Sequence, residues 1–326
     1  MARVVSIARR AEPIRGGRRG SVVLGLLMPA LLLTACLNAL DGRRASASEP
    51  APLQVLLTSS ELVVGQNRFA FGLLKQNTLL ADADVVVRVY DIRDEDATLA
   101  TEAPAPYREL EVVEDGRPVH IHPDGTRHVH GGTTDVRGIY VARVSFGRPG
   151  VWGVEVLARR ADGGLEATRF SVDVLAVSST PALGTAAPRS RNLIAGDVLN
   201  LRQIDSSEPS DPRLHQTRIA DAIAQGKPQV IVFASPRLCA SRVCGPVVDV
   251  VRTLIPTYGD RVVFVHQEIW QRDAYQQFTS TVKEWNLRSE PWIFVVDGTG
   301  TIRAKFEGLT TRRELEAAVV QMLRAE

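Results

Sequence analysis

The chain has 326 residues, of which 44% are hydrophobic, 23% charged and 6% aromatic. This composition is typical of folded globular protein and excludes long disorder, collagen and a bundle of membrane helices, while the length predicts about two domains. The net charge is +2, but residues 1–35 carry six arginines against Glu12, so the remaining chain is slightly acidic. Without a stripe of lysine and arginine, the chain gives no reason to expect nucleic-acid binding.

The first 35 residues have the layout of a secretory signal peptide. The arginines are followed by an apolar run from Ser21 to Leu33, which contains Pro29. This run of 13 residues is shorter than the roughly 20 residues that a membrane-spanning helix needs. We therefore expect a signal peptide at residues 1–35 rather than a lasting transmembrane anchor.

The apolar run ends in Leu33-Thr34-Ala35-Cys36, which resembles the lipobox of bacterial lipoproteins. The resemblance implies that Cys36 is lipidated and becomes the first residue of the mature protein, with residues 36–52 as a tether. It also implies a lipid-anchored protein of the bacterial cell membrane that faces the extracytoplasmic space. The alternative is an ordinary secreted protein whose Cys36 lies by chance at the end of its leader.

The cysteine count agrees with lipidation. Three cysteines are an odd number for an exported protein, but if Cys36 carries lipid, only Cys239 and Cys244 remain. These two can pair with each other, and outside the cytosol such a disulfide persists.

Residues 53–177 form the first expected domain. Short alternating segments broken by turn residues, without a helical period, predict an antiparallel β-sandwich of roughly eight strands. Two of its segments, 137–146 and 149–156, resemble neighbouring strands of an immunoglobulin-like domain. The expected strands are 53–57, 67–74, 84–92, 119–122, 128–130, 138–146, 152–158 and 168–176.

A linker and a second domain follow. Residues 178–192 are small, polar and proline-containing, which is typical of a mobile linker, so we place a linker at 178–195 and the second domain at 196–326. In that domain we expect strands at 230–234, 262–268, 292–296 and 301–306. We expect helices at 247–258, at 274–285 behind a cap at Asp273, and from Thr311, where Glu314 completes a capping box. The order β-α-β-α-β-β-α is that of the thioredoxin fold.

The segment VIVFASPRLCASRVCGP (230–246) resembles the active-site region of thioredoxin-like proteins, in which an apolar strand leads through a loop to two cysteines at the start of a helix. The resemblance makes Cys239 the attacking cysteine and Cys244 the resolving one. It also implies that Pro291, in Ser-Glu-Pro-Trp, is the family's cis-proline beside the disulfide. A helix N-terminus stabilises a thiolate, and Arg237 and Arg242 would act in the same direction.

Four departures from the family pattern qualify this activity. Four residues separate the cysteines instead of two, so Cys239 must lie in the loop, because positions five apart on a helix point about 140° away from each other. Val232 stands where thioredoxins often carry a buried acid, and Leu238 replaces the tryptophan that precedes the first cysteine. Glu290 places a carboxylate near the thiols, and a nearby negative charge raises a thiol's pKa. These departures favour a narrower redox role over general disulfide reduction, or a structural disulfide without turnover. Thiolate metal binding is a third interpretation, by analogy with copper-delivering thioredoxin-like proteins, with His266 as third ligand.

Four of the six histidines, His120, His122, His128 and His130, lie around the turn signal Pro-Asp-Gly at 123–125. If His122 pairs with Thr126, His120 faces His128 and all four histidines share one face of a hairpin. Two His-x-His strands side by side suit copper, zinc or nickel. The alternative is a solvated polar face that titrates near neutral pH.

Together these patterns predict an immunoglobulin-like β-sandwich followed by an α/β thioredoxin-like domain. The expected function is that of a membrane-anchored thiol–disulfide oxidoreductase that needs no cofactor and exchanges with protein thiols or disulfides of unknown identity. One alternative is a copper- or zinc-binding lipoprotein that resembles a metallochaperone and uses the hairpin histidines. The other is a redox-inert binding lipoprotein with a structural disulfide.

Overall fold

The computed structural model describes residues 52–93, 96–110, 113–114, 117–121, 127–129, 138–239, 243–271 and 274–325, with the backbone alone for 113–129 and 274–276 within these ranges. The expected signal peptide at residues 1–35 lies outside the described residues, as do Cys36, His122, His130 and Arg242. Residues 50–326 form one compact unit. In the described part of the chain, no helix is both long and apolar enough to cross a membrane.

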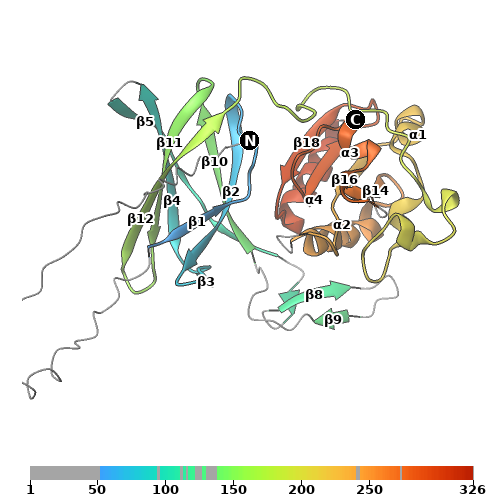
Figure 1. The fold of residues 1–326 in the computed structure, drawn as a ribbon, viewed down its shortest axis with the longest axis horizontal. Helices are drawn as coiled ribbons and strands as arrows, with labels where there is room; N and C mark the ends of the chain where they lie inside the picture. The colour runs from blue at the N-terminus through green and yellow to red at the C-terminus, as the bar shows by residue number, and fades with distance from the viewer. Residues whose placement is uncertain are drawn as a thin grey trace, which may run out of the picture. The chain divides into compact units, whose positions relative to one another are not determined.

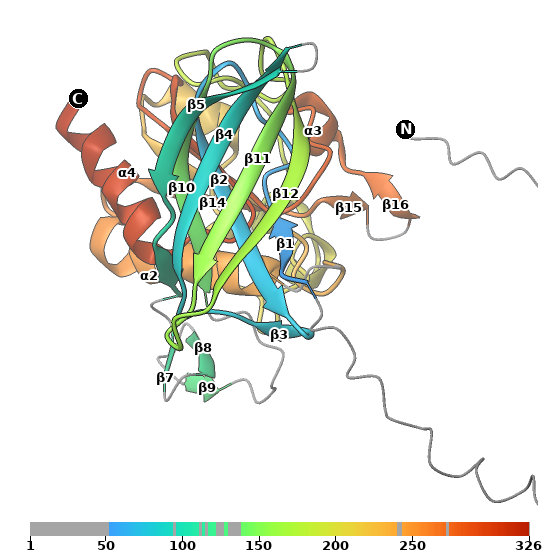
Figure 2. The same ribbon diagram turned by 90° about the vertical axis from the view of Figure 1, so that its left-hand side faces the viewer.

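The N-terminal region is a β-sandwich of two antiparallel sheets, as the alternating pattern predicts. One sheet has the order β1-β2-β10-β6, with β3 beside β2, and the other has the order β12-β11-β4-β5. Figure 2 shows the second sheet in front of β2 and β10. The first sheet comprises β1 (Gln54–Leu57), β2 (Gly65–Lys75), β3 (Thr78–Leu79), β6 (Tyr107–Glu109) and β10 (Gly138–Phe146); the second comprises β4 (Asp84–Arg93), β5 (Asp96–Pro104), β11 (Gly150–Arg159) and β12 (Leu165–Val174).

Alternate residues of these strands fill the core between the two sheets. Phe69 and Phe71 of β2 and Tyr140 of β10 are fully buried and pack with Val87 and Val154 of the opposite sheet. Strand β5 had no counterpart among the expected strands, because its first five residues are all exposed and carry no apolar alternation. Its register with β4 is set by backbone pairing, which a hydrophobic pattern does not reveal.

A separate three-stranded sheet contains β7 (Val113–Glu114), β8 (Arg117–Ile121) and β9 (Arg127–Val129). Strands β8 and β9 pair antiparallel with His120 opposite His128. This backbone register is the one that the hairpin pattern predicts.

The segment expected to be a mobile linker is held in place by hydrogen bonds. Ser179 donates its backbone N–H to Glu61 at 2.8 Å, and Ala186 forms a β-bridge with Thr301. The Ser190 hydroxyl accepts a hydrogen bond from the indole of Trp285 at 3.1 Å. The small polar side chains that resemble a flexible linker here act as partners for polar groups of the folded protein, so mobility was the wrong inference from composition.

The main elements of the C-terminal region follow the expected order around a four-stranded sheet (Figure 1), but a helix before the first strand of this sheet and a short two-stranded hairpin after the second were not expected. The sheet order is β14-β13-β17-β18, with β14 parallel to β13 and the other pairs antiparallel. The strands are β13 (Gln229–Phe233), β14 (Val263–Gln267), β17 (Trp292–Val296) and β18 (Ile302–Glu307). The helices are α1 (Ile219–Ala224), α2 (Cys244–Tyr258), α3 (Ser280–Glu284) and α4 (Arg312–Ala325), preceded by the short 3-10 turns η1 (Ala195–Asp197), η2 (Leu201–Gln203) and η3 (Pro212–His215).

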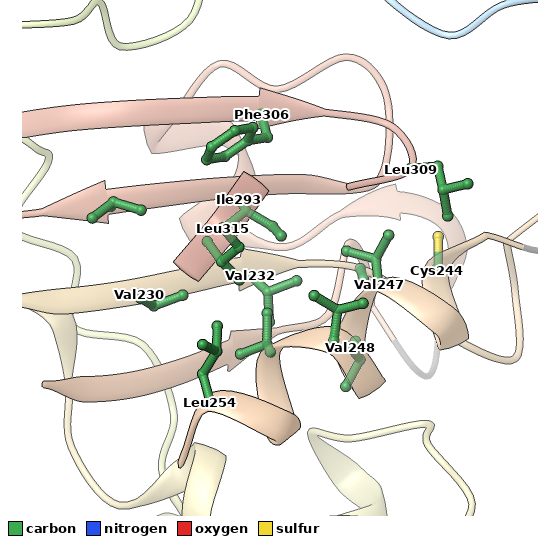
Figure 3. Close-up of a cluster of buried hydrophobic side chains, with 14 of the residues drawn as sticks. Val230, Val232, Cys244, Val247, Val248, Leu254, Ile293, Phe306, Leu309 and Leu315 are labelled. Atoms are coloured by element: carbon green, nitrogen blue, oxygen red, sulfur yellow. The ribbon is translucent and has the colours of Figure 1, made fainter. Parts of the chain in front are cut away.

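The central strands bury both faces, which explains their unbroken apolar sequences. Val230 and Val232 of β13 pack in one cluster with residues of α2 and α4, whereas Ile231 and Phe233 pack in another with residues of α1 and α3. Figure 3 shows the first cluster, with Cys244 at one end of it, at the start of α2. The first turn of α2 is thereby fixed against the sheet.

The expected helix at 274–285 is wrong in its first half. Residues 274–278 form β16 (Ala274–Phe278), which pairs with β15 (Trp270–Gln271), and only Ser280–Glu284 is helical. The rings of Trp270 and Phe278 stack at 4.9 Å, and such cross-strand aromatic pairs stabilise a hairpin. The helix cap is the Thr279 hydroxyl, which accepts from the Val282 N–H at 3.4 Å, whereas Asp273 lies outside the described residues.

Candidate functional site

Cys239 and Cys244 form a disulfide between the loop after β13 and the first residue of α2. Their Cα atoms are 6.0 Å apart, and Cys239 lies in the loop, as the spacing of the two cysteines requires. Cys239 is 8% exposed and Cys244 is fully buried. Cys239 is thus the more exposed of the two cysteines.

The start of α2 offers the electrostatic setting expected for a reactive thiol. Its N-cap residue, Val243, makes no side-chain capping hydrogen bond, and the N–H groups of the first turn carry a partial positive charge at the end of the helix where Cys244 lies. Arg237 is exposed, and its guanidinium lies 3.8 Å from the carboxylate of Glu208. That ion pair moderates the contribution of Arg237 to the thiols.

Glu290 is the carboxylate beside the disulfide. Its Oε2 lies 3.5 Å from Cys244 Sγ and accepts a hydrogen bond from the Ser235 N–H at 2.9 Å. Its Oε1 accepts a hydrogen bond from the Trp270 indole at 3.0 Å. Two donors from different elements therefore hold this carboxyl group against the sulfur of Cys244.

The environment of Glu290 favours its protonated form. Burial raises the pKa of Glu290, and the hydrogen bonds from Trp270 and Ser235 only partly offset this, while the negative charge of Glu268 adds to the rise. A carboxyl group with a raised pKa exchanges protons closer to neutral pH than an ordinary glutamate does. Glu290 is thus equipped to take a proton from a thiol or return one to a thiolate.

The peptide bond between Glu290 and Pro291 is cis, as the resemblance to thioredoxin-like proteins implies. Pro291 is buried, and its carbonyl accepts a hydrogen bond from the Gly308 N–H at 2.9 Å. Gly308 has φ +73°, and an added Cβ would lie 2.9 Å from Thr58 Cβ. This close approach explains glycine at the position that meets the cis-proline.

His266 does not join the cysteines. Its ring is fully buried on β14, with Nε2 2.9 Å from the Ala234 carbonyl and Nδ1 3.5 Å from Asp205 Oδ1. The ionisable residue that groups with the two cysteines is Glu290, whereas His266 groups with Asp205 and His215. The local pattern gave Glu290 as a carboxylate near the thiols, but Asp205, His215, Ser235 and Trp270 carried no recognisable motif.

The histidine hairpin is described only in its backbone. His120 and His128 are register partners, and His122 and His130 lie outside the described residues. The hairpin histidines therefore remain candidates for a metal site from their sequence and register.

Comparisons with known proteins agree with the C-terminal fold. Residues 216–323 match the thioredoxin-like domain family. A solved structure of murine CRIg matches with a TM-score of 0.22 and 10% identity, over 39% of this chain and all of that chain, and we base no argument on it. No curated protein matches the chain significantly. The chain thus carries an N-terminal β-sandwich and a C-terminal thioredoxin-like domain with a close Cys239–Cys244 pair.

Proposed function

We propose that the chain is a thiol–disulfide oxidoreductase that uses Cys239 and Cys244. The observation that carries this proposal is the half-buried carboxyl group of Glu290, 3.5 Å from Cys244 Sγ. A disulfide that only fastened a loop to a helix would gain nothing from this group, because burying a carboxyl group costs free energy. A resolving thiol, in contrast, needs a nearby acceptor for its proton.

The exchange runs as two substitutions at sulfur. In the reduced protein, the Cys239 thiolate attacks a partner disulfide, so that a mixed disulfide forms and one partner thiolate leaves. Cys244 gives its proton to Glu290, and its thiolate attacks Cys239 Sγ. The Cys239–Cys244 disulfide forms, and the second partner thiolate leaves and takes up a proton. Two electrons have then passed to the partner. The reverse sequence oxidises a partner dithiol.

The partner class that suits this site is a protein thiol or disulfide. Leu238, next to Cys239, is 39% exposed, and an exposed apolar side chain beside the attacking sulfur offers a contact that a folded partner covers. Pro291 directly follows Glu290, whose carboxyl group lies 3.5 Å from Cys244 Sγ. A site with these features accepts a narrower set of partners than a general reductase does.

A redox titration tests the proposal. The full chain is equilibrated in thiol buffers of defined potential, free thiols are trapped, and mass spectrometry counts the modified cysteines. We expect a reversible two-electron transition of Cys239 and Cys244 between about −120 and −270 mV, the range of known oxidoreductases. A pair that stays oxidised below about −300 mV would be a structural staple, and the proposal would then be abandoned.

Two variants assign the roles of the cysteines. Cys239→Ser is expected to abolish exchange with a dithiol substrate, whereas Cys244→Ser is expected to trap the mixed disulfide on Cys239. Cys36→Ser is the matched control, because it removes the third cysteine and leaves the pair in place. Full exchange activity in Cys239→Ser would overturn the assignment.

We further propose that lipid on Cys36 anchors the protein to the bacterial cell membrane with both domains on the extracytoplasmic side. The support is the Leu-Thr-Ala-Cys pattern after an apolar run of 13 residues. Labelling cells with a radioactive fatty acid is expected to label the wild-type chain and not Cys36→Ser. Equal labelling of the two chains would exclude Cys36 as the lipid site.

A second candidate function is binding of copper or zinc by the histidine hairpin. The observation in its favour is the register of β8 and β9, which places His120 opposite His128. Metal retained in stoichiometric amount by the wild type is expected to be lost when His120 and His128 are replaced by alanine. Unchanged retention in that variant would exclude the hairpin site.

A further inference from the structure

The fold brings together the two histidines that lie outside the hairpin. His215 ends η3 and His266 lies on β14, and their ring centroids are 5.3 Å apart. Asp205, in the loop after η2, reaches both rings. All three side chains have no exposed surface, so bulk solvent does not reach their polar atoms.

The spacing of the three residues fits one metal ion. Asp205 Oδ2 lies 3.1 Å from His215 Nε2, and Asp205 Oδ1 lies 3.5 Å from His266 Nδ1. One ligand atom from each residue lies within 4.8 Å of the other two. Ligands bound tetrahedrally at about 2.0–2.1 Å lie roughly 3.3–3.4 Å from one another, so small adjustments suffice to bring these atoms onto a common centre.

The outer contacts of the cluster are those that orient metal ligands. The Ala234 carbonyl accepts a hydrogen bond from His266 Nε2 at 2.9 Å, which assigns a proton to Nε2 because a carbonyl only accepts. His266 Nδ1 therefore faces the cluster. The Asp205 carboxylate accepts backbone N–H bonds from Ser207 at 2.8 Å and Asp211 at 3.1 Å, and such partners typically hold ligating histidines and carboxylates in place.

A positive charge between Asp205 and His266, supplied by a metal ion or by a proton on His266 Nδ1, satisfies both groups. With a proton on Nε2, a neutral His266 directs the Nδ1 lone pair at the Asp205 carboxylate, and two buried acceptors then face each other. His215 Nδ1 is also buried without a hydrogen-bond partner among the described residues. The carboxylate of the nearby Asp211, in contrast, is paired with the guanidinium groups of Arg213 at 2.7 Å and Arg252 at 3.5 Å.

We propose that Asp205, His215 and His266 bind a divalent first-row transition metal ion, with zinc as the representative. Two imidazoles and one carboxylate, without a thiolate, suit zinc, cobalt or iron(II) and do not suit copper(I). The site shares no residue with the cysteine pair or with the hairpin, and the inference does not depend on the proposed redox function. Because His266 donates a hydrogen bond to the Ala234 carbonyl, the ion would also fix the end of β13, which leads into the loop that carries Cys239.

A cobalt titration of the full chain tests the proposal. In a variant with His120, His122, His128 and His130 replaced by alanine, His215 and His266 are the only histidines left. After chelation and dialysis, we expect this variant to bind one equivalent of Co²⁺ with ligand-field absorption bands and two sets of paramagnetically shifted imidazole NMR signals. Absence of tight Co²⁺ binding, or binding without shifted imidazole signals, would overturn the proposal.

Two further variants in the same background locate the ion. His266→Gln is expected to weaken Co²⁺ binding at least tenfold, whereas replacing Cys239 and Cys244 by serine is expected to leave it unchanged. Equal binding by His266→Gln and its parent, with circular dichroism showing both folded, contradicts the site. If His266→Gln does not fold, the shifted imidazole signals of the parent still decide, because no other histidine can produce them. A proton on His266 in place of a metal would give a folded parent without Co²⁺ binding.

Discussion

At the scale of single residues, the carboxyl group near the cysteines comes from a different position than in many thioredoxins. Val232, on β13, occupies the position at which thioredoxins often carry a buried acid, and it is fully buried in an apolar cluster. Glu290, which precedes the cis-proline, instead places its carboxyl group 3.5 Å from Cys244 Sγ. In the proposed mechanism, the proton acceptor therefore comes from a different segment of the chain, the one that precedes Pro291.

Replacing Glu290 by glutamine therefore tests how the proton moves. Glu290 accepts a proton only when ionised, so resolution by Cys244 is expected to accelerate as the pH rises through the raised pKa of Glu290. In Glu290→Gln this pH-dependent step should disappear, and resolution near neutral pH should slow about 100-fold. Stopped-flow measurement of the decay of the mixed disulfide on Cys239 gives the rate.

The control for this change is Glu109→Gln, at an exposed position of β6, which should leave the rate as it is. A Glu290→Gln chain that keeps the wild-type rate and pH profile would show that Glu290 takes no part in proton transfer.

At the scale of secondary-structure elements, the sequence signal that starts α4 involves only residues close together in the chain. The helix of α4 begins where the capping box predicts, and the Thr311 hydroxyl accepts from the Glu314 N–H at 3.4 Å while Glu314 Oε2 accepts from the Thr311 N–H at 3.3 Å. The same Glu314 carboxylate also binds the guanidinium of Arg68 from β2, at 2.9 Å. One cap residue therefore serves both the helix end and a contact with the β-sandwich.

Thr311→Ala removes the cap hydroxyl and is expected to lower the free energy of unfolding by about 1 kcal/mol, the usual contribution of a threonine N-cap. Urea unfolding followed by circular dichroism measures this change. Gln321→Ala, at an exposed position inside α4, serves as control and should stay within about 0.5 kcal/mol of the wild type. A loss in Thr311→Ala no larger than in the control would show that the box does not stabilise α4.

At the scale of the whole molecule, the β-sandwich and the thioredoxin-like domain share buried contacts. Ala70, Ile139 and Val141 of the first sheet belong to the same apolar cluster as residues of α2 and α4. Glu61 accepts hydrogen bonds from Lys305 of β18 at 2.8 Å and from the Ser179 hydroxyl at 2.6 Å. A single carboxylate thereby joins the start of the sandwich, the segment after it and the C-terminal sheet.

The contacts of Glu61 predict that the folded protein loses stability in acid. Burial works to raise the pKa of Glu61, but hydrogen bonds from Lys305, Ser178 and Ser179 outweigh it and lower the pKa from 4.5 to about 2. A lowered carboxyl pKa contributes stability that is fully present well above pH 4.5 and is lost as the pH falls toward 2. Glu61→Gln is therefore expected to lower the free energy of unfolding by about 2 kcal/mol at pH 7.

Urea unfolding at pH 7, 4 and 2 checks this prediction. The difference between Glu61→Gln and the wild type should shrink as the pH falls, and Asp173→Asn, at an exposed position of β12, should show no such difference. A Glu61→Gln chain as stable as the wild type at pH 7 would contradict the role of this contact.

The sequence alone determined the features that depend on neighbours in the chain. Alternation of apolar residues predicts the two-sheet sandwich, unbroken apolar runs predict β13 and β17, and the motif around Cys239 and Cys244 predicts the disulfide at the start of α2. These signals are local, because side-chain period, helix caps and loop closure involve residues a few positions apart. The cis bond before Pro291 also followed from the resemblance.

The tertiary structure alone decided which distant side chains meet. Asp205 and His266 are 61 positions apart, yet the pairing of β14 beside β13 and the packing of η3 bring them within 3.5 Å. Strand β16 replaced an expected helix because Phe278 stacks on Trp270, a contact that a helical period cannot reveal. The polar segment 178–192 is ordered because its hydroxyl groups meet Glu61 and Trp285, and composition records the hydroxyl groups but not their partners.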